Sequence, residues 1–235
     1  MSKDGFIFKR VEKKYLLDGD TRERLTESIA EHLVPDKYGR STISSLYLDT
    51  PDFRIIRASI EAKLWSHPYK EKLRLRTYGV PTDSTKVYLE IKKKYDGVVY
   101  KRRMSLSHAE AVDYIRGGEK PPDSQIMREI DYAMNFYGGI RPTAVVSYER
   151  DAFFIRDNPA IRVTFDSGVR YRSDGLDLTL GNEGKPIVPD GLCIMEIKTD
   201  GAMPLWLSHR LDELAIFPAS FSKYGTAYAD MKNSL

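Results

Sequence analysis

Cysteine is almost absent from this chain. Cys193 is the single one in 235 residues, and it stands in an apolar stretch. One thiol excludes a disulfide framework and a zinc site built from cysteines, and it is typical of a reducing compartment. We therefore expect Cys193 to be a small buried side chain and the protein to be cytoplasmic.

Long hydrophobic runs are missing as well. The first ten residues, MSKDGFIFKR, lack the apolar core of a secretion signal. No apolar run reaches the ~20 residues that a helix needs to cross a bilayer. We therefore expect no membrane span.

The chain also lacks a strong excess of positive or negative charge. Lys and Arg number 37 and Asp and Glu 34, so the formal net charge is only +3. A balance of this kind excludes a surface that attracts nucleic acid over its whole area, and only the placement of the charges can be informative. The length and the 41% of hydrophobic residues predict a single domain over residues 1–235.

Charged residues recur at every second position in several segments. Residues i and i+2 of a strand point to the same face, and the residues between the charges, such as Leu73, Leu75 and Ile197, are mostly apolar. Each segment therefore predicts a strand with one charged and one apolar face. The charged rows are Arg10-Glu12-Lys14, Lys72-Arg74-Arg76, Glu90-Lys92-Lys94, Lys101-Arg103, Arg162-Thr164-Asp166 and Glu196-Lys198.

Hairpin, capping and periodicity signals divide the chain into strands and helices. Strands are expected over 6–16, 41–48, 70–78, 85–94, 98–106, 143–150, 160–166, 169–174 and 192–198. Helices are expected over 18–34 (capped by Asp20), 51–60, 107–115, 124–137, 205–217 and 222–231. The fold class is α+β, with a closed, antiparallel, eight-stranded β-barrel and flanking helices, since eight strands suffice to close a barrel with a usable interior.

A charged row on a strand is often only the solvated face of a half-buried sheet. Two features favour a polar interior instead. Arginine is frequent in these rows, and its planar guanidinium matches phosphate. Carboxylates accompany the cations, as in Glu90 with Lys92, and such a mixture can bind an anion together with a hard divalent metal. Phosphoryl transfer needs this combination.

Seven short segments resemble, in their order, the motifs of one family. They are Arg10-Val-Glu-Lys-Lys-Tyr15, Ser45-Leu-Tyr-Leu-Asp49, Tyr69-Lys-Glu-Lys-Leu-Arg-Leu-Arg76, Glu90-Ile-Lys92, Tyr148-Glu-Arg150, Glu196-Ile-Lys198 and Phe221-Ser-Lys-Tyr224. The chain resembles the VTC (vacuolar transporter chaperone) domain polyphosphate polymerases, within the triphosphate tunnel metalloenzymes, over residues 6 to 230. Its length is similar to that of a stand-alone prokaryotic member.

The resemblance implies a tunnel that binds ATP or another nucleoside triphosphate with Mn²⁺ or Mg²⁺. The γ-phosphoryl group would pass to a growing polyphosphate, with release of the diphosphate; triphosphate and phosphate are further ligands of such a tunnel. It implies a catalytic role for Lys14, Arg74, Arg76, Arg150 and Glu196, with Glu196 and Glu90 as metal ligands. The implied phosphate-binding residues are Arg10, Lys14, Lys72, Arg74, Arg76, Lys92, Lys101, Arg103, Arg150, Arg162, Lys198 and Lys223.

Two departures from the family pattern stand out. Arg10 occupies the first position of the superfamily's Glu-x-Glu-x-Lys motif, which favours the polymerase branch over a two-metal hydrolase. Ser220 stands where the fungal proteins tend to have a second lysine before Lys223. Three alternatives stay open: a tunnel triphosphatase, a non-catalytic polyphosphate sensor, and a binder of single-stranded RNA. We expect no specific recognition of nucleic acid.

Overall fold

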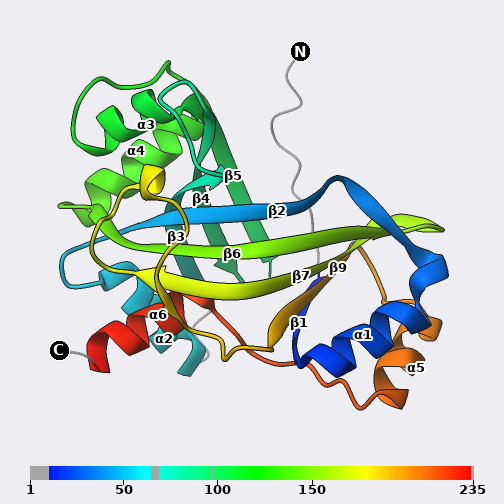
Figure 1. Ribbon diagram of the computed structural model, residues 1–235. Helices are drawn as coiled ribbons and strands as arrows, with labels where there is room; N and C mark the ends of the chain where they lie inside the picture. Colours follow the sequence, from blue (N-terminus) through cyan, green and yellow to red (C-terminus); the bar gives the residue numbers. More distant parts are fainter. Residues whose placement is uncertain (1–10, 65–68, 97, 234–235) are drawn as a thin grey trace.

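The computed structural model describes residues 11–64, 69–96 and 98–233 (Figure 1). Its strands are β1 (Val11–Leu17), β2 (Leu33–Asp49), β3 (Tyr69–Tyr78), β4 (Lys86–Tyr95), β5 (Val98–Ser107), β6 (Arg141–Ile155), β7 (Asn158–Arg172), β8 (Lys185–Pro186) and β9 (Cys193–Thr199). Its helices are α1 (Gly19–Ser28), α2 (Arg54–Leu64), α3 (His108–Ile115), α4 (Gln125–Tyr137), α5 (Leu205–Glu213) and α6 (Lys223–Asn233). Two short 3-10 turns, η1 (Ala30–His32) and η2 (Leu178–Leu180), complete the set. None of the helices in the described part is long and apolar enough to cross a membrane.

All the strands belong to one antiparallel sheet. Their order is β1-β9-β7-β6-β2-β3-β4-β5, and β8 pairs with β7 beside this path. The α+β class and the antiparallel sheet were predicted correctly. The expected closure was not found: among the described residues no backbone ladder joins β5 to β1.

Side chains nevertheless link the two ends of the sheet. Lys92 on β4 lies 3.7 Å from Glu12 on β1 (Nζ to Oε2), although β1 begins the strand order and β4 is the last strand but one. The sheet is therefore curled, with β1 and β4 facing each other across its concave side.

The alternation of charged and apolar residues separates the two faces of the sheet. Helices α1 and α5 cover the apolar face of β1, β9 and β7, where Tyr15, Phe165 and Met195 are buried. Helices α3 and α4 cover the apolar face of β3, β4 and β5 around Leu75 and Leu89. Figure 1 shows these two helix pairs at opposite ends of the molecule.

A third apolar cluster lies on the concave side. Tyr224 of α6 stacks on Tyr47 of β2, with ring centroids 4.3 Å apart, and Ile56 of α2 belongs to the same cluster. Because Tyr47 also contacts Arg74, these helices pack against the charged face. Helices α2 and α6 therefore occupy one end of the concave side, and the charged residues occupy the rest.

Several expected element bounds were wrong. The helix expected over 18–34 ends at Ser28, and β2 already begins at Leu33, because Leu33 and Val34 pair with Ile155 and Phe154 of β6. The N-cap of α1 is Asp18 and not the expected Asp20. The Asp18 carboxylate accepts a hydrogen bond from the Thr21 amide.

Other strands are longer than expected. The two strands expected over 160–166 and 169–174 form one strand, β7, which passes through Gly168 at φ +57°. A glycine tolerates this left-handed conformation, so the strand continues beyond the register shift opposite Ser147 and Glu149. The helix expected to reach residue 217 ends at Glu213, close to Ala215 at φ +53°.

Two local signals were read correctly. The Ser107–Glu110 capping box starts α3, with both of its reciprocal hydrogen bonds present. The β4–β5 hairpin is confirmed by the pairing of Tyr95 with Val98. Gly97 of its turn, and the expected strand residues 6–10, lie outside the described residues.

Candidate functional site

Glu196 lies at the centre of one group of charges on the concave face. Strand β9 places it opposite Lys14 of β1, and its side chain is only 8% exposed. The ammonium of Lys198 donates to Oε2 at 2.9 Å, and Lys14, Arg150 and Lys223 approach the carboxylate to 3.4, 3.8 and 3.8 Å. Burial alone would raise the pKa of Glu196, but these four cations hold it well below its usual value.

Asp166 anchors two of the same cations. It is fully buried, and its carboxylate accepts hydrogen bonds from Nε and NH2 of Arg150 at 2.6 and 2.7 Å and from Nζ of Lys223 at 2.5 Å. Burial opposes its ionisation, but the charges of Lys223 and Arg150 prevail and lower the pKa of Asp166. We call these residues the Glu196 cluster: Lys14, Arg150, Asp166, Glu196, Lys198 and Lys223.

A second group forms on β3, β4 and β5. Glu90 is 1% exposed, and Nε and NH2 of Arg74 donate to its Oε2 at 2.9 and 2.8 Å. Lys101 forms a salt bridge with its Oε1 at 2.6 Å. The charges of Arg74, Arg76 and Lys101 outweigh the effect of burial and lower the pKa of Glu90. We call these residues the Glu90 cluster: Arg74, Arg76, Glu90 and Lys101.

Arg76 is held without a carboxylate. Its Nε donates to Ser45 Oγ at 3.1 Å and its NH2 to the Tyr148 hydroxyl at 3.2 Å. The Tyr148 ring also lies 5.2 Å from the Arg150 guanidinium and 4.6 Å from the Lys223 ammonium. Tyr148 thus joins the two clusters and orients cations from both.

Lys72 and Lys92 lie between the clusters. Lys92 reaches Glu12, as described above, and Glu12 is also 3.6 Å from the ammonium of Lys14. Lys72 donates to Ser222 Oγ at 2.8 Å, and burial lowers its pKa to about 8.

The segment before α6 crosses the concave side. Its Ala219 amide donates to the Lys14 carbonyl at 2.7 Å, and Lys14 Nζ donates to the Phe221 carbonyl at 3.1 Å. Together with the bond from Lys72 to Ser222, these contacts attach the segment to both β1 and β3.

Tyr47 has an unusual electrostatic environment. Burial would raise the pKa of its phenol, but Arg74, Lys72 and Arg76 lower it to about 8. Arg74 NH1 also donates to the hydroxyl at 3.4 Å. A phenol that titrates near neutral pH among cations is a group that a bound anion would strongly affect.

Most of the phosphate ligands expected from the sequence share the concave side. Arg162 and Arg103 stand opposite Lys198 and Glu90 in the register, but their side chains have other partners: Arg162 is held by Asp36 at 2.5 Å, and the exposed Arg103 lies over the Tyr88 ring at 4.7 Å. Arg10 falls outside the described residues. The structure brings together Lys14, Lys72, Arg74, Arg76, Lys92, Lys101, Arg150, Lys198 and Lys223.

The carboxylate oxygens of the site are the groups that a divalent metal would use as ligands. Both oxygens of Glu90 contact cations, and so do both oxygens of Glu196, so a metal at either carboxylate would share it with these side chains. Glu12 and Glu196 also flank the Lys14 ammonium, at 3.6 and 3.4 Å, so a cation already lies between two carboxylates there. Within the described residues, no group of three or more Asp, Glu, His or Cys residues could hold a metal. The donors fit a Mg²⁺-like ion that takes one or two carboxylates and completes its shell with phosphate oxygens and water.

The geometry defines a class of protein. Nine cations from several strands converge on one concave, partly buried face, with three buried carboxylates between them. Such a face binds a polyanion along several strands at once, since arginine and lysine together can contact many phosphate oxygens. The geometry is that of a polyanion-binding face.

The family follows from the comparison of the sequence with known families. The model of the VTC domain matches residues 9–232, so the chain belongs to the VTC domain family. No curated protein matches the chain.

Solved structures show the same fold. A Bacillus halodurans protein with a provisional assignment as adenylate cyclase shares 13% identity over 91% of this chain and 93% of its own, with a TM-score of 0.54. A Hippeastrum protein with a provisional adenylyl cyclase assignment, reported to have a dominant triphosphatase activity, shares 14% identity over 94% of this chain and 96% of its own, with a TM-score of 0.57. At these identities, the likeness shows a shared fold alone.

Sequence reasoning gave no role to Asp166 or Tyr148. Asp166 stands in one of the charged rows, and that position was the available signal. Tyr47 and Tyr148 lie within motifs that carried the resemblance, but nothing in a single strand shows which cation a tyrosine will meet on another strand.

Proposed function

We propose that this protein is a polyphosphate polymerase. It would transfer the γ-phosphoryl group of ATP, or of another nucleoside triphosphate, to the end of a polyphosphate chain. A terminal oxygen of the acceptor attacks the γ-phosphorus, the bond from that phosphorus to the β–γ bridging oxygen breaks, and the nucleoside diphosphate leaves. An anionic acceptor needs no general base, so no histidine is required.

The observation that supports the proposal best is the Glu196 cluster. Four cations surround one buried carboxylate, and two of them, Arg150 and Lys223, are also fixed by Asp166. These cations are positioned before any substrate binds, and positioning with charge neutralisation is most of what phosphoryl transfer needs.

The two clusters would share the substrate between them. Arg74 and Arg76 would bind the phosphates of the triphosphate from β3, and Lys14, Arg150 and Lys223 would bind them from the opposite side. Lys72, Lys92, Lys101 and Lys198 would follow the chain along the concave side, with Arg103 and Arg162 nearer its ends. Because the described backbone ladder is open between β5 and β1, the proposal includes closure of the tunnel by the side chains and the segment before α6.

A divalent ion, Mn²⁺ or Mg²⁺, would be held by Glu196 with Glu12 and would neutralise charge on the phosphate oxygens when bound. The location proposed for the enzyme is the cytoplasm, where nucleoside triphosphates are available.

The experiment is incubation of the purified protein with ATP and Mn²⁺, followed by gel staining for polyphosphate and assay of free orthophosphate. A ladder of polyphosphate that is absent with Glu196→Gln supports the polymerase. Glu23→Gln, an exposed carboxylate on α1, is the matched control and should leave the ladder unchanged.

The same assay separates the alternatives. Orthophosphate release without a ladder would replace the polymerase with a tunnel triphosphatase, the activity reported for the Hippeastrum protein. If neither product forms but triphosphate still raises the melting temperature, the protein is a phosphate sensor. Circular dichroism of Glu196→Gln distinguishes a lost activity from a lost fold.

A further inference from the structure

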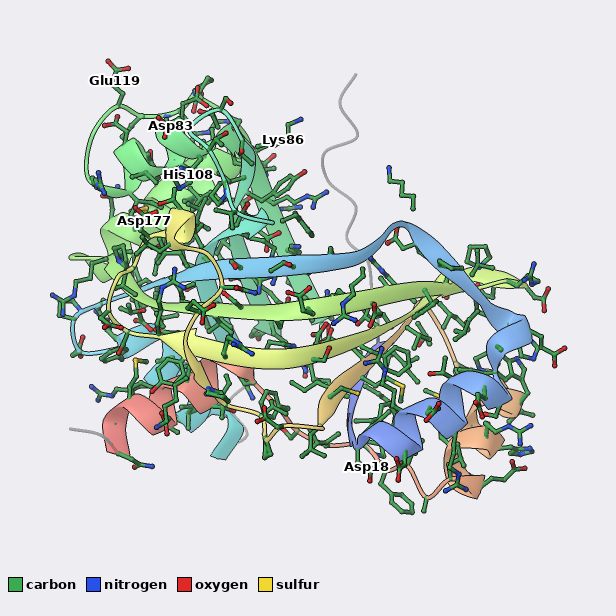
Figure 2. All side chains as sticks on the ribbon, in the orientation of Figure 1. Asp18, Asp83, Lys86, His108, Glu119 and Asp177 are labelled. Carbon is green, nitrogen blue, oxygen red and sulfur yellow. The ribbon has the colours of Figure 1, made fainter. Side chains whose placement is uncertain are left out.

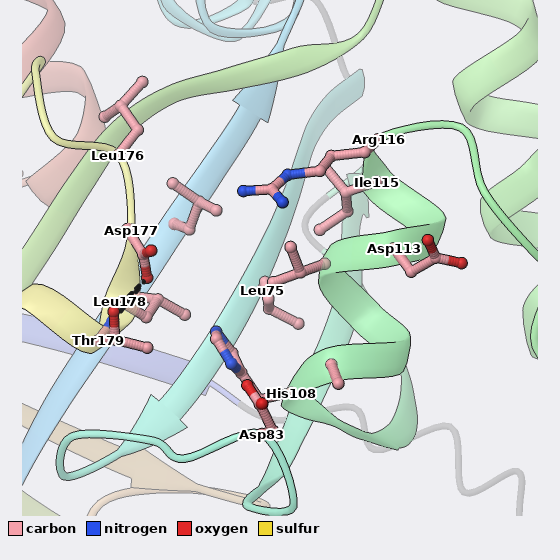
Figure 3. A pocket seen from close by; sticks show the side chains of 13 residues that line it. Leu75, Asp83, His108, Asp113, Ile115, Arg116, Leu176, Asp177, Leu178 and Thr179 are labelled. Carbon is pink, nitrogen blue, oxygen red and sulfur yellow. Dashed lines mark hydrogen bonds between the residues drawn. The ribbon is translucent and has the colours of Figure 1, made fainter.

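A cavity of about 460 Å³ lies outside the charged face. It is bounded by α3, the β3–β4 turn at Asp83 and the loop that carries η2, as Figure 3 shows. Figure 2 places Asp83, His108 and Asp177 together at this end of the molecule, away from Asp18 at the start of α1. We call it the α3 cavity; its volume is in the range of small-molecule sites.

The floor of the α3 cavity is apolar and carries one unsatisfied polar atom. Leu46, Leu75 and Leu178 are at most 4% exposed. His108 lines the same cavity and is 5% exposed, and its Nδ1 has no hydrogen-bond partner among the residues that the structure describes. A buried nitrogen without a partner is unfavourable, so a ligand that bonds to it would gain free energy there.

The rim carries charges of both signs. Asp83 and Asp177 supply carboxylates, and Arg116 supplies a guanidinium that is directed toward the cavity (Figure 3). Asp177 Oδ1 accepts two hydrogen bonds from Thr179, from its amide and its hydroxyl, each at 2.8 Å. These bonds fix the Asp177 side chain, and no described residue bonds to Oδ2, which is left for a ligand.

This combination indicates the chemistry of a ligand. Metal binding is disfavoured, since no three metal-ligating side chains cluster in the described part of the chain. We propose that the α3 cavity binds a small zwitterion with an apolar body, of the chemical class of the aliphatic α-amino acids. The ammonium binds Asp177 Oδ2 and His108 Nδ1, the carboxylate binds Arg116, and the hydrocarbon side chain packs on the leucine floor.

The site is separate from the proposed reaction but adjoins its machinery. Leu75 on the cavity floor stands between Arg74 and Arg76 in β3, and its neighbours point to the opposite face of the sheet. The cavity therefore backs onto the wall that carries two of the phosphate-binding arginines. The proposal does not depend on the polymerase activity and is tested without it.

Three probes that share the isobutyl group of leucine test the proposal by calorimetry and thermal shift on the full chain. L-leucine carries both charges, isoamylamine lacks the carboxylate, and 4-methylpentanoate lacks the ammonium. We expect leucine to bind most tightly, isoamylamine about tenfold more weakly for the lost pair with Arg116, and 4-methylpentanoate least, because carboxylates outnumber the single guanidinium among the lining residues.

Two variants locate the binding. Arg116→Gln should remove the preference for leucine over isoamylamine, and Asp177→Asn should weaken both, while its amide oxygen can still accept from Thr179. Arg24→Gln, an exposed arginine on α1, is the control and should change neither. The proposal is overturned if no probe binds at millimolar concentration, if both variants bind like the parent, or if triphosphate displaces the probe by competing for one site.

Discussion

At the residue scale, each group of cations depends on a buried carboxylate. Asp166 is fully buried and contacts Arg150 and Lys223 at 2.5–2.7 Å. Removing one partner of a buried ion pair costs far more stability than the pair contributes on balance, because the remaining charge is left uncompensated. The carboxylates of the site therefore maintain its fold, and they also hold the cations apart in the absence of a phosphate ligand.

Asp166→Asn should lower the free energy of unfolding by about 3–5 kcal/mol, since two buried cations lose their counter-charge. Denaturant unfolding measures the loss. Triphosphate should raise the melting temperature more in the variant than in the parent, because the ligand supplies the missing negative charge.

Asp151→Asn is the control for this prediction. Asp151 also pairs with an arginine, Arg22, at 2.6 Å, but that pair is partly exposed and lies outside the two clusters. Its loss should be at most about 1 kcal/mol, with no added effect of triphosphate. Equal losses for the two variants would contradict the view that burial sets the difference.

At the element scale, the sequence predicted the faces of the strands better than their ends. Alternation correctly assigned Lys72, Arg74 and Arg76 to one face of β3 and Leu73 and Leu75 to the other. It could not place the start of β2, since Leu33 and Val34 also fit the spacing of the preceding helix and only their pairing with β6 makes them a strand. Long-range pairing overrides local periodicity there.

The sequence could not predict which cations contact each buried carboxylate, for a similar reason. A period of two shows that Glu90 and Glu196 share a face with cations, but it does not show which cations contact them. That depends on register and on the curl of the sheet. Glu90 was also expected to bind a metal; it contacts Arg74 and Lys101, and its role as a metal ligand stays a prediction. The single-domain prediction for residues 1–235 stays a prediction.

Strands β2 and β3 also predict a pH dependence. Lys72 and Tyr47 both have a pKa of about 8, Lys72 because of burial and Tyr47 because Arg74, Lys72 and Arg76 outweigh burial. Above pH 8 the lysine loses its positive charge and the phenol gains a negative one, and both changes oppose a polyanion. Triphosphate affinity should therefore be highest below pH 8 and fall as the pH rises through it.

Calorimetry between pH 7 and 9 measures this fall, with Lys72→Arg as the matched variant because arginine stays protonated. The triphosphate affinity of Lys72→Arg should fall less steeply with pH. Adding Tyr47→Phe should remove most of the pH dependence that remains. A parent profile that is flat across this range, or a steep profile in the double variant, would show that other groups titrate.

At the scale of the whole molecule, net charge is a poor guide to binding. The chain carries a formal charge of only +3, yet nine cations gather on the concave side because strand alternation selects one face and the curl brings distant strands together. The electrostatic potential that attracts a polyanion is therefore confined to the concave side, and partial burial of the charges strengthens it.

Adjacent lysines on β1 test this directly. Lys14 faces the concave side and contacts Glu12, Glu196 and the Phe221 carbonyl, whereas Lys13 pairs in register with Ile197 and is exposed. Lys14→Gln and Lys13→Gln change the net charge equally. Lys14→Gln should weaken triphosphate binding about tenfold or more, the size of one lost charge-assisted hydrogen bond.

Lys13→Gln should change the affinity little, and that small change should vanish as salt is raised, because exposed charges are screened beyond about 10 Å at 0.1 M ionic strength. The Lys14→Gln effect should persist in salt, since its side chain is only 23% exposed. Calorimetry of both variants at low and high salt compares their triphosphate affinities, and because the two have the same net charge, any difference comes from the position of the lost lysine. Equal effects would mean that the overall field, rather than the concave face, attracts the triphosphate.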